Sequence, residues 1–520
     1  MKKKINIFAL SAYILCSLIL FAYFAGIVSV NFSKIPFYYT TDMYSDMMYA
    51  GEVWEHKNIF PTGWVFGNQI YAIGTPVFAA LFFGLTHDYC IAMALASTFN
   101  GIFVLLSFSW MLKPFMKELH YRLLACTALM TLMLASGDAF LQFHGWQLFF
   151  TMCSYYACYA IIAFLCFGCY IRSTYTWSRG LLAITIVSCF LSFGAGIQSL
   201  RQTAVMVCPL VAVEFIRMLF LYIKKQKLFT KSTLTAALFS VSNILGLLYV
   251  KFADIKQVTV FGGSALKPLS EVIPDISNSI HTAFSLLWPK HYNAVIPCAV
   301  ILLITLFLIY RLIKTKNPSA VYCLLLFLVS VCVLFVIDIF TSMIVRDIYY
   351  FMLYPACALL VALLSKHFGK IAHVAALIAL LILFVNNYNL KVSHLIFSPY
   401  KNDSLKEVCE YLDNNNINTV YSAWNCAERI AIESDFKIQA GFWGFDPLVC
   451  VKHLCNAEVF EAEPAESAYL FYTEDSMNKA MEIAQAAGTS LSLEAYFENS
   501  GIYLCTSDDN VMKICTEADK

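Results

Sequence analysis

The sequence predicts a polytopic α-helical membrane protein with a C-terminal α/β soluble domain. The chain has 520 residues, of which 60% are hydrophobic and only 13% are charged, whereas a soluble domain carries about 25% charged residues. Apolar runs of about 20 residues, the length that crosses the hydrocarbon core of a bilayer, recur as far as residue 388. Beyond that residue the apolar runs stop and the charge density rises. We therefore expect a membrane domain over 1–388 and a soluble domain over 389–520.

The first apolar run, 5–30, is expected to remain in the mature protein as a transmembrane helix. It follows Lys2, Lys3 and Lys4, it is too long for the core of a signal peptide, and it has no small-residue cleavage site. With it, the chain is expected to have about eleven transmembrane helices. The others are expected near 88–112, 123–138, 148–170, 181–198, 202–223, 233–252, 292–312, 318–340, 348–365 and 371–388.

The apolar segment 69–85 decides the predicted sidedness of the rest of the chain. It is only about 24 Å long as a helix and contains Gly74, Thr75 and Pro76. If it does not cross, most lysines and arginines of the connecting loops fall on the side of the N-terminus, as the positive-inside rule requires; if it crosses, this distribution inverts. We therefore expect an interfacial helix inside a first outer loop, 31–87. The N-terminus is then cytoplasmic and the C-terminal domain extracytoplasmic.

The C-terminal part alternates between strand and helix patterns. TVYSAW, FKIQAGFW and SAYLFYTE are typical of strands; LKEVCEYLDN, which Asp403 can cap, AERIAIES and SMNKAMEIAQAAG are typical of helices, and Gly488 can end the last one. This alternation predicts a small α/β domain. Cys450 and Cys455 are not at CxxC spacing and no histidine pattern accompanies them, so we expect no metal site there.

Carboxylates gather in the first outer loop, in the stretch YYTTDMYSDMMYAGEVWEHKNIFPTGW that spans 38–64. Asp42 and Asp46 are four residues apart and would share one face of a helix, beside an apolar stripe that runs from Met43 to Trp54. We predict a helix that lies flat on the outer leaflet and holds both carboxylates just above the lipid. Either one would then be placed to act as a general base towards a lipid-linked substrate. The alternative is an ordinary amphipathic helix whose acids are simply solvated.

Two stretches resemble the GT-C superfamily of polyprenyl-phosphate-sugar-dependent glycosyltransferases. TTDMYSDMMYAGEVWEHKNIFPTGW is similar to that superfamily's acidic residue followed by a helix and an aromatic turn, and VRDIYYFMLYPACALL, 345–360, is similar to its late Arg-Tyr-aromatic-Pro segment. The layout of spans, outer loop and C-terminal domain is similar along nearly the whole chain. Many members carry paired acids where this chain has Asp42-Met43. This departure leaves open whether Asp42 or Asp46 is the base and whether a divalent metal takes part; no other cofactor is implied.

Two arginines are candidate phosphate ligands. Arg201 lies between two spans and Arg346 at the end of another, both on the predicted outer side, where an arginine can hold a phosphate through two parallel charged hydrogen bonds. The resemblance implies that a polyprenyl phosphate is the leaving group, whose charge these cations would stabilise. Lys290 is a further candidate for the phosphate, and Gln69 for a sugar hydroxyl. Alternatively, the arginines are interfacial side chains that reach towards water, or Arg346 pairs with a neighbouring aspartate.

Together these patterns predict an integral-membrane glycosyltransferase, inverting by resemblance. It would move a sugar from a polyprenyl-phosphate donor to a glycan, lipid or protein acceptor of the cell envelope, on the outer face of the membrane. Membrane lipid is the other expected partner, and the net charge of +1 gives no reason to expect a nucleic acid. A transporter or flippase of a lipid-linked or small polar substrate is the first alternative, although the spans are nearly free of charge and no repeat is visible. A non-catalytic membrane protein with the same layout is the second.

Overall fold

The computed structural model describes residues 7–33, 41–135, 144–151, 154–253, 255–258, 265–287, 294–343, 345–393, 396, 405–444 and 447–518. The chain forms two compact units. The first is made of Met1–Asn31, Ser97–Ala253 and Gly262–Ser398, and the second of Phe32–Ala96, Asp254–Phe261 and Pro399–Lys520. The second unit thus combines the first predicted outer loop with the C-terminal part. The division into domains 1–388 and 389–520 stays a prediction.

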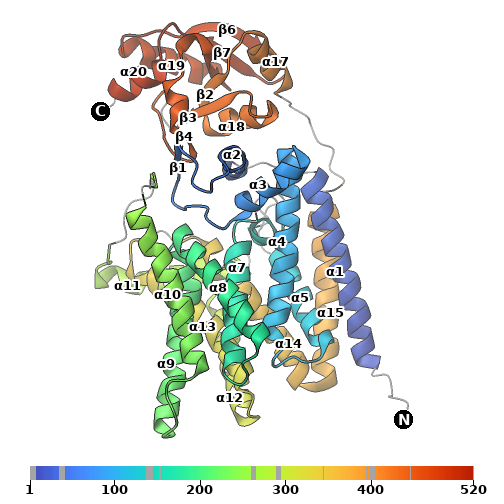
Figure 1. The fold of residues 1–520 in the computed structure, drawn as a ribbon. Coiled ribbons are helices and arrows are strands. Elements are labelled where there is room, and N and C mark those ends of the chain that lie inside the picture. The colour runs from blue at the N-terminus through green and yellow to red at the C-terminus, as the bar shows by residue number, and fades with distance from the viewer. Residues whose placement is uncertain are drawn as a thin grey trace. The chain divides into compact units, whose positions relative to one another are not determined.

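The first unit is a bundle of long apolar helices (Figure 1). In the described part of the chain, nine helices are long and apolar enough to cross a membrane. They are α1 (Ile7–Ser33), α4 (Tyr89–Leu112), α8 (Arg179–Gln198), α9 (Cys208–Ile223) with η2 (Thr203–Val207), α10 (Lys231–Phe252), α12 (Val295–Lys314), α13 (Pro318–Phe340), α14 (Leu353–His367) with η3 (Asp347–Tyr350), and α15 (Gly369–Asn387) with η4 (Tyr388–Ser393). These helices make the chain a multi-pass membrane protein, as the sequence predicts.

Two further predicted spans are helices of 17 residues each, α5 (Leu119–Ala135) and α7 (Ala157–Ser173). Each is about 25 Å long, at the lower limit for a transmembrane helix. Together with the nine longer helices, they account for the eleven or so predicted spans. The shorter helices α6 (His144–Phe149) and α11 (Leu269–Phe284) complete this unit.

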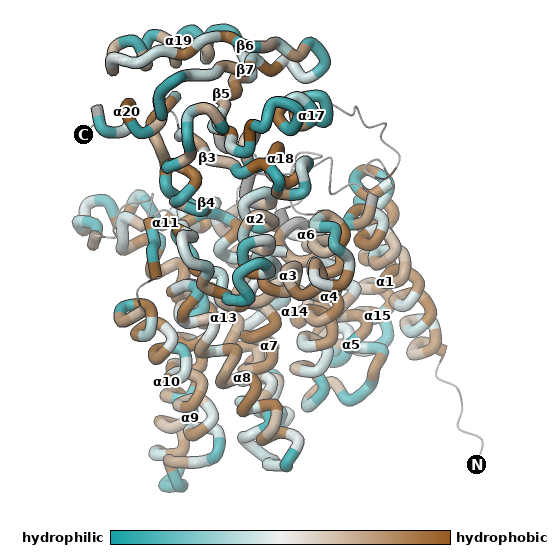
Figure 2. Tube along the Cα trace, turned by 45° about the horizontal axis from the view of Figure 1, so that its top comes forward, coloured by the Kyte–Doolittle hydropathy of each residue, from teal (hydrophilic) through white to brown (hydrophobic). Residues whose placement is uncertain are grey.

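The outward faces of the bundle carry large apolar side chains. Phe21 is 74% exposed, Phe190 73% and Phe215 65%. In Figure 2 the long helices of this unit are predominantly hydrophobic along their length, whereas α17 (Lys406–Asn414) in the second unit is predominantly hydrophilic. Phenylalanines exposed in this number are unfavourable in water, but they fit a surface that is covered by lipid.

Glycines bring α8 and α10 close together. A Cβ atom at Gly196 would collide with the backbone carbonyl of Asn243, and one at Gly246 with that of Phe193. Small residues of this kind allow the backbones of neighbouring membrane helices to touch. The contact fixes the last turns of α8, which ends three residues before Arg201.

The second unit contains the α/β domain. Its sheet has five strands in the order β3-β2-β5-β7-β6; β2 is parallel to β3 and β5, whereas β7 is antiparallel to β5 and β6. The strands are β2 (Thr419–Ala423), β3 (Gln439–Trp443), β5 (Ser467–Phe471), β6 (Ser492–Phe497) and β7 (Ile502–Thr506), and the helices are α17, α18 (Trp424–Glu433), α19 (Glu474–Ala486) and α20 (Val511–Ala518).

The α/β class of the C-terminal part is confirmed, as are the three predicted strands and three predicted helices. Gly488 follows α19 with φ +83°, a left-handed conformation that ends the helix. The predicted cap Asp403 lies outside the described residues, and α17 begins at Lys406 after Leu405. The sequence patterns did not predict β6, β7 and α20.

The first outer loop is built into the second unit. Its helix α2 (Thr41–His56) packs against α3 (Thr75–Thr86) and α18. Its strand β1 (Trp64–Val65) pairs antiparallel with β4 (Cys455–Asn456). In α3, 12 residues give a helix about 18 Å long, too short to span. The helix begins at Thr75 rather than at residue 69, because the extended Gly74 precedes it and Pro76 is favourable only in the first turn.

Candidate functional site

The two candidate catalytic acids lie one turn apart on α2. Asp42 is the second residue of the helix, and Asp46 is fully buried. From Met43 to Ala50 every residue is buried, so α2 does not have the single buried face that the sequence predicted. The physical reason is that α3 and α18 both pack on it. For Asp46, the alternative of a simply solvated acid is therefore wrong, whereas its place just above the lipid stays a prediction.

A buried hydrogen bond ties α2 to the α/β domain. The Ser45 hydroxyl donates to Oε1 of Glu428 on α18, at 2.5 Å, and both side chains are fully buried. Burial raises the pKa of Tyr49, and the negative charge of Asp46 raises it further. The helix that carries the acids is thus held by polar contacts inside the protein rather than by an apolar stripe alone.

Arg201 is surrounded by tyrosines. Its guanidinium carbon lies 4.8 Å from the ring centre of Tyr156, 5.7 Å from that of Tyr159 and 4.5 Å from that of Tyr349. All three distances are within the range of cation–π attraction. Tyr156 and Tyr159 come from the start of α7, and Tyr349 from η3 before α14. Two separate segments of the bundle therefore hold one arginine.

Arg346 lies in the same neighbourhood. The backbone N–H of Tyr349 donates to the Arg346 carbonyl at 3.0 Å, and the Tyr349 ring lies 4.5 Å from the Arg201 guanidinium carbon. The two arginines therefore lie at the same end of the bundle. The structure thus brings together the two arginines that the sequence selected. Their role as phosphate ligands stays a prediction.

In the described part of the chain, neither arginine forms an ion pair with a carboxylate. The neighbouring aspartates have other partners: Asp338 accepts a hydrogen bond from Tyr350 at 3.0 Å, and Asp347 accepts one from Ser285 at 3.4 Å. Arg346 is exposed rather than paired with one of them, in contrast to the alternative interpretation. The two cations therefore remain available to an anion.

Backbone and amide contacts fix the position of Arg201. The N–H of Arg201 donates to Oγ of Ser199 at 3.1 Å, just after α8 ends. On either side of it, Gln198 donates to the Tyr159 hydroxyl at 3.1 Å and Gln202 to the Tyr159 carbonyl at 3.4 Å. Arg201 therefore sits on a segment whose neighbours are bonded to α7, so that its head group is pre-positioned.

An apolar groove begins beside this cluster. Its empty space measures about 1040 Å³, and it is lined by α11, α12, α13 and α14. Leu353, three residues after η3, and Phe335, whose ring lies 5.0 Å from that of Tyr350, both belong to its wall. The groove therefore starts next to the segment that carries Arg346 and Tyr349. Its lining is almost wholly apolar and fits a hydrocarbon chain.

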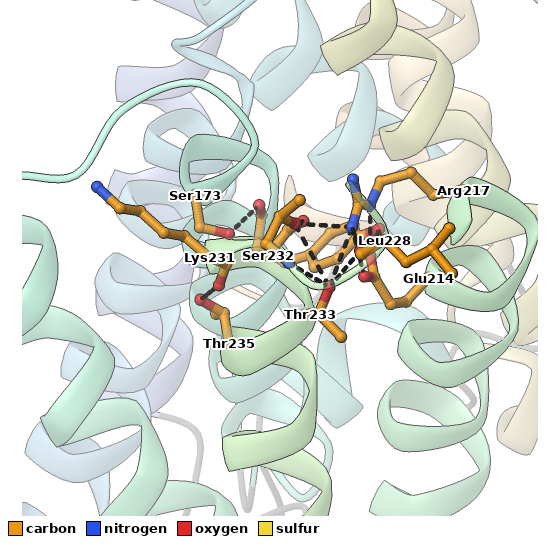
Figure 3. Close-up of polar contacts among 10 residues, drawn as sticks. Ser173, Glu214, Arg217, Leu228, Lys231, Ser232, Thr233 and Thr235 are labelled. Atoms are coloured by element: carbon orange, nitrogen blue, oxygen red, sulfur yellow. Dashed lines mark hydrogen bonds and ion pairs between the residues drawn. The ribbon is translucent and has the colours of Figure 1, made fainter. Parts of the chain in front are cut away.

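A second charged cluster lies at the other end of α9 and has a different character (Figure 3). Arg217 donates two hydrogen bonds to the Glu214 carboxylate, at 2.7 and 2.6 Å, and Tyr170 donates a third at 2.9 Å. Arg217 also donates to Thr230 at 2.7 Å and to Thr233 at 3.1 Å. These threonines begin α10, so the pair lies at the edge of the bundle. Protein groups satisfy both charges, which makes it a structural clamp rather than a binding site.

Two further candidate site residues, Lys290 and Gln69, remain. Lys290 lies outside the described residues. Gln69 lies between β1 and α3 in the second unit, where it is partly buried. Asp42, Asp46 and Gln69 thus belong to one unit, and Arg201 and Arg346 to the other. That these groups converge on one sugar–phosphate bond stays a prediction.

Comparison with solved structures identifies the fold of the chain. No family model and no curated protein sequence matches the chain. Among solved structures, ArnT from Cupriavidus metallidurans in the apo state has a TM-score of 0.55 at 9% identity, over 96% of this chain and 98% of that one. The same protein bound to undecaprenyl phosphate has a TM-score of 0.50 at 10% identity, over the same shares. An oligosaccharyltransferase from Archaeoglobus fulgidus, in complex with Zn and sulfate, has a TM-score of 0.46 at 10% identity over 89% of this chain and 69% of that one.

The chain has the GT-C fold. The alignment with ArnT runs over nearly the full length of both chains, so the membrane helices and the C-terminal domain of the GT-C layout are both included. The fold predicted from the resemblance is confirmed.

The tyrosines around Arg201 were missed by the sequence analysis. They stand at helix ends, as Tyr155-Tyr156 and Tyr349-Tyr350. At such positions tyrosine normally indicates an anchor at the membrane interface. The signal available was that one tyrosine pair, Tyr349-Tyr350, falls with both arginines at predicted ends of spans on one side.

Proposed function

We propose that this protein is a membrane glycosyltransferase that takes a sugar from a polyprenyl-phosphate donor. The observation that carries the proposal is the pair Arg201 and Arg346, which both contact Tyr349, close to an apolar groove. Two guanidinium groups that have no carboxylate partner among the described residues suit a phosphate, and the groove suits the isoprenoid chain attached to it. The GT-C fold and the membrane helices support the same kind of enzyme.

In this proposal a carboxylate of α2, Asp42 or Asp46, removes the proton from an acceptor hydroxyl. The hydroxyl oxygen attacks the anomeric carbon, and the bond between that carbon and the phosphate oxygen breaks with its electron pair on the phosphate. Arg201 and Arg346 stabilise the negative charge that develops there. Attack from the side opposite the phosphate inverts the anomeric centre.

The acceptor in this proposal is a glycan, lipid or protein of the cell envelope on the outer face. The N-terminus is cytoplasmic and the C-terminal domain extracytoplasmic, which follows from the positive-inside rule. Reporter fusions at both termini test this orientation. Transfer measured before and after chelation with EDTA tests whether a divalent metal takes part with the carboxylates.

The experiment measures transfer of labelled sugar from a polyprenyl-phosphate donor in membranes. Arg201→Ala and Arg346→Ala should each lower the rate about 10- to 150-fold, because a hydrogen bond to a charged group contributes about 1.5–3 kcal/mol. Arg311→Ala is the matched control, since Arg311 also stacks on an aromatic ring, that of Phe368 at 4.5 Å, but lies outside the cluster.

The carboxylates are tested by Asp42→Asn and Asp46→Asn, singly and together. Undiminished transfer by the double variant would remove these acids from the mechanism. Movement of the lipid-linked sugar across the membrane without any covalent product would instead favour a flippase. The closed clamp at Glu214 and Arg217 offers such a transported substrate no free charge.

A further inference from the structure

The second unit contains a cleft between α2 and one edge of its sheet. Its lining residues all belong to this unit: Met48, Gly51, Glu52, Glu55, Ala431, Phe436, Gln439, Ala440, Asn456 and Val459. The empty space of this open cleft, its mouth included, measures about 480 Å³. The proposed transfer reaction does not use it.

Two carboxylates and two amides supply the polar lining. Glu52 and Glu55 are three residues apart on α2 and share one face of the helix. Asn456 donates to Oε1 of Glu52 at 3.4 Å, and Nδ1 of His56 lies 3.4 Å from Oε2. Burial raises the pKa of Glu52, and the Asn456 amide only partly offsets this effect. Glu52 is therefore oriented by the protein before any ligand arrives.

The pairing of β1 with β4 fixes the Asn456 amide. Asn456 lies opposite Trp64 in this ladder, and its Oδ1 accepts the backbone N–H of Glu458 at 3.1 Å. A Cβ atom at Gly63, which has φ +85°, would press directly on that amide. The wall of the cleft is thus built from two segments far apart in the sequence.

Other polar groups of the cleft remain available. Within the described residues, the side chains of Glu55 and Gln439 have no hydrogen-bonding partner in the protein, and both are exposed. A carboxylate accepts hydrogen bonds, whereas an amide both donates and accepts. The cleft therefore offers acceptors and a donor at its rim, above the oriented Glu52.

An aromatic ring forms part of the wall. Asp435 and Phe436 both have left-handed backbone conformations, with φ +53° and +60°, and the Phe436 ring lies 4.2 Å from that of Tyr89. Such conformations are unfavourable for residues with a side chain and are often found at ligand sites. A Cβ atom at Gly51 would lie 3.2 Å from the Tyr89 ring and 3.5 Å from the Phe436 ring, so a glycine there keeps the floor open.

We propose that this cleft is a saccharide-binding site that takes one neutral or amino-bearing sugar ring. The sugar hydroxyls would donate to Glu52 and Glu55 and exchange hydrogen bonds with Gln439 and Asn456, while the apolar face of the ring would pack on Phe436. The two carboxylates and the absence of a cation from the lining disfavour an anionic sugar. In the proposed transferase this sugar would belong to the acceptor. That last step rests on the proposed function, whereas binding itself does not.

The test measures binding of three methyl glycosides, those of glucose, glucosamine and glucuronic acid, to the full-length protein in detergent by saturation-transfer NMR. We expect saturable millimolar binding of the first two, and binding of the glucuronide at least about tenfold weaker. Glu55→Gln and Gln439→Leu should each weaken the glucoside about tenfold. Both side chains are exposed, so neither change should disturb folding. Glu55→Gln should also reduce the difference in affinity between the glucoside and the glucuronide.

Glu482→Gln is the control, because Glu482 is an exposed acid on α19 of the same unit and does not line the cleft. Absence of binding by all three glycosides, equal binding of the glucuronide, or wild-type binding by both cleft variants would each overturn the proposal. Arg201→Ala should lose sugar transfer but keep glycoside binding. Failure of the transfer hypothesis is thus distinguishable from failure of this one.

Discussion

Removing one partner of the clamp between Glu214 and Arg217 should lower the free energy of unfolding far more than replacing both partners with apolar residues. Both side chains are buried, 6% and 7% exposed. Glu214→Ala removes the carboxylate but leaves the Arg217 guanidinium buried with only neutral oxygens, among them Thr230 and Thr233. Breaking a buried pair on one side costs about 3–5 kcal/mol, which is about a 10²- to 10⁴-fold change in the unfolding equilibrium.

Removing both charges should cost less than removing one. In the double variant Glu214→Leu/Arg217→Met no buried charge remains, and the main loss is the hydrogen bond that Tyr170 donates at 2.9 Å. An unsatisfied buried hydroxyl costs about 1–3 kcal/mol. The double variant is therefore expected to be more stable than either single variant, with a coupling energy of several kcal/mol.

The assay is reversible unfolding in mixed detergent and SDS micelles, followed by tryptophan fluorescence. The control is the exposed pair Lys406–Glu410, whose side chains are 79% and 62% exposed and whose removal should change stability by less than about 1 kcal/mol. Hydrogen bonds between membrane helices average only about 0.6 kcal/mol. A coupling energy near that value at Glu214 and Arg217 would refute the clamp.

Three further predictions concern packing, pH and the position of α2. Gly196→Val should separate α8 from α10 and lower the yield of folded protein, whereas Gly180→Ala in the open first turn of α8 should be tolerated; thermal unfolding in detergent measures both. Because burial raises the pKa of Glu52, its proton binds more tightly in the folded state, so its contribution to stability is greatest below the unfolded pKa and falls as pH rises towards the folded one. Glu52→Gln should remove that fall, which unfolding midpoints from about pH 4 to about pH 8 would show. Ser45→Ala should cost about 1.5–3 kcal/mol by removing a hydrogen bond to buried Glu428, and should speed hydrogen exchange in α2.

The membrane helices were predictable because one physical quantity, the thickness of the hydrocarbon core, sets their length. A helix needs about 20 apolar residues to cross the hydrocarbon core, and that requirement is visible in the sequence without knowledge of any partner. The same holds for α3, whose short length excluded a span. Its start at Thr75 depended on Pro76 and could have been predicted from that residue alone.

The surroundings of the candidate site could not be predicted in the same way. The burial of Asp46 results from α3 and α18 together, and α18 lies far along the chain, so no pattern within α2 reveals it. The arginines were found from their sidedness, but the tyrosines that hold Arg201 come from the starts of other helices. Strands β6 and β7 differ from these cases, because they form a local hairpin whose short connection ends at Gly501 with φ +67°, a turn signal that the sequence analysis did not use.

The pairing of β1 with β4 has a consequence for how the protein is made. Val65 and Cys455 are paired in one ladder, yet they are roughly 390 residues apart in the sequence. At about 5–20 residues per second, the ribosome adds Cys455 roughly 20 to 80 seconds after Val65. Throughout that interval α2 has only α3 of its two packing partners, because α18 is also made late. A stop codon late in the message would therefore leave the first loop, although fully translated, without β4 and without the part of its environment that α18 supplies.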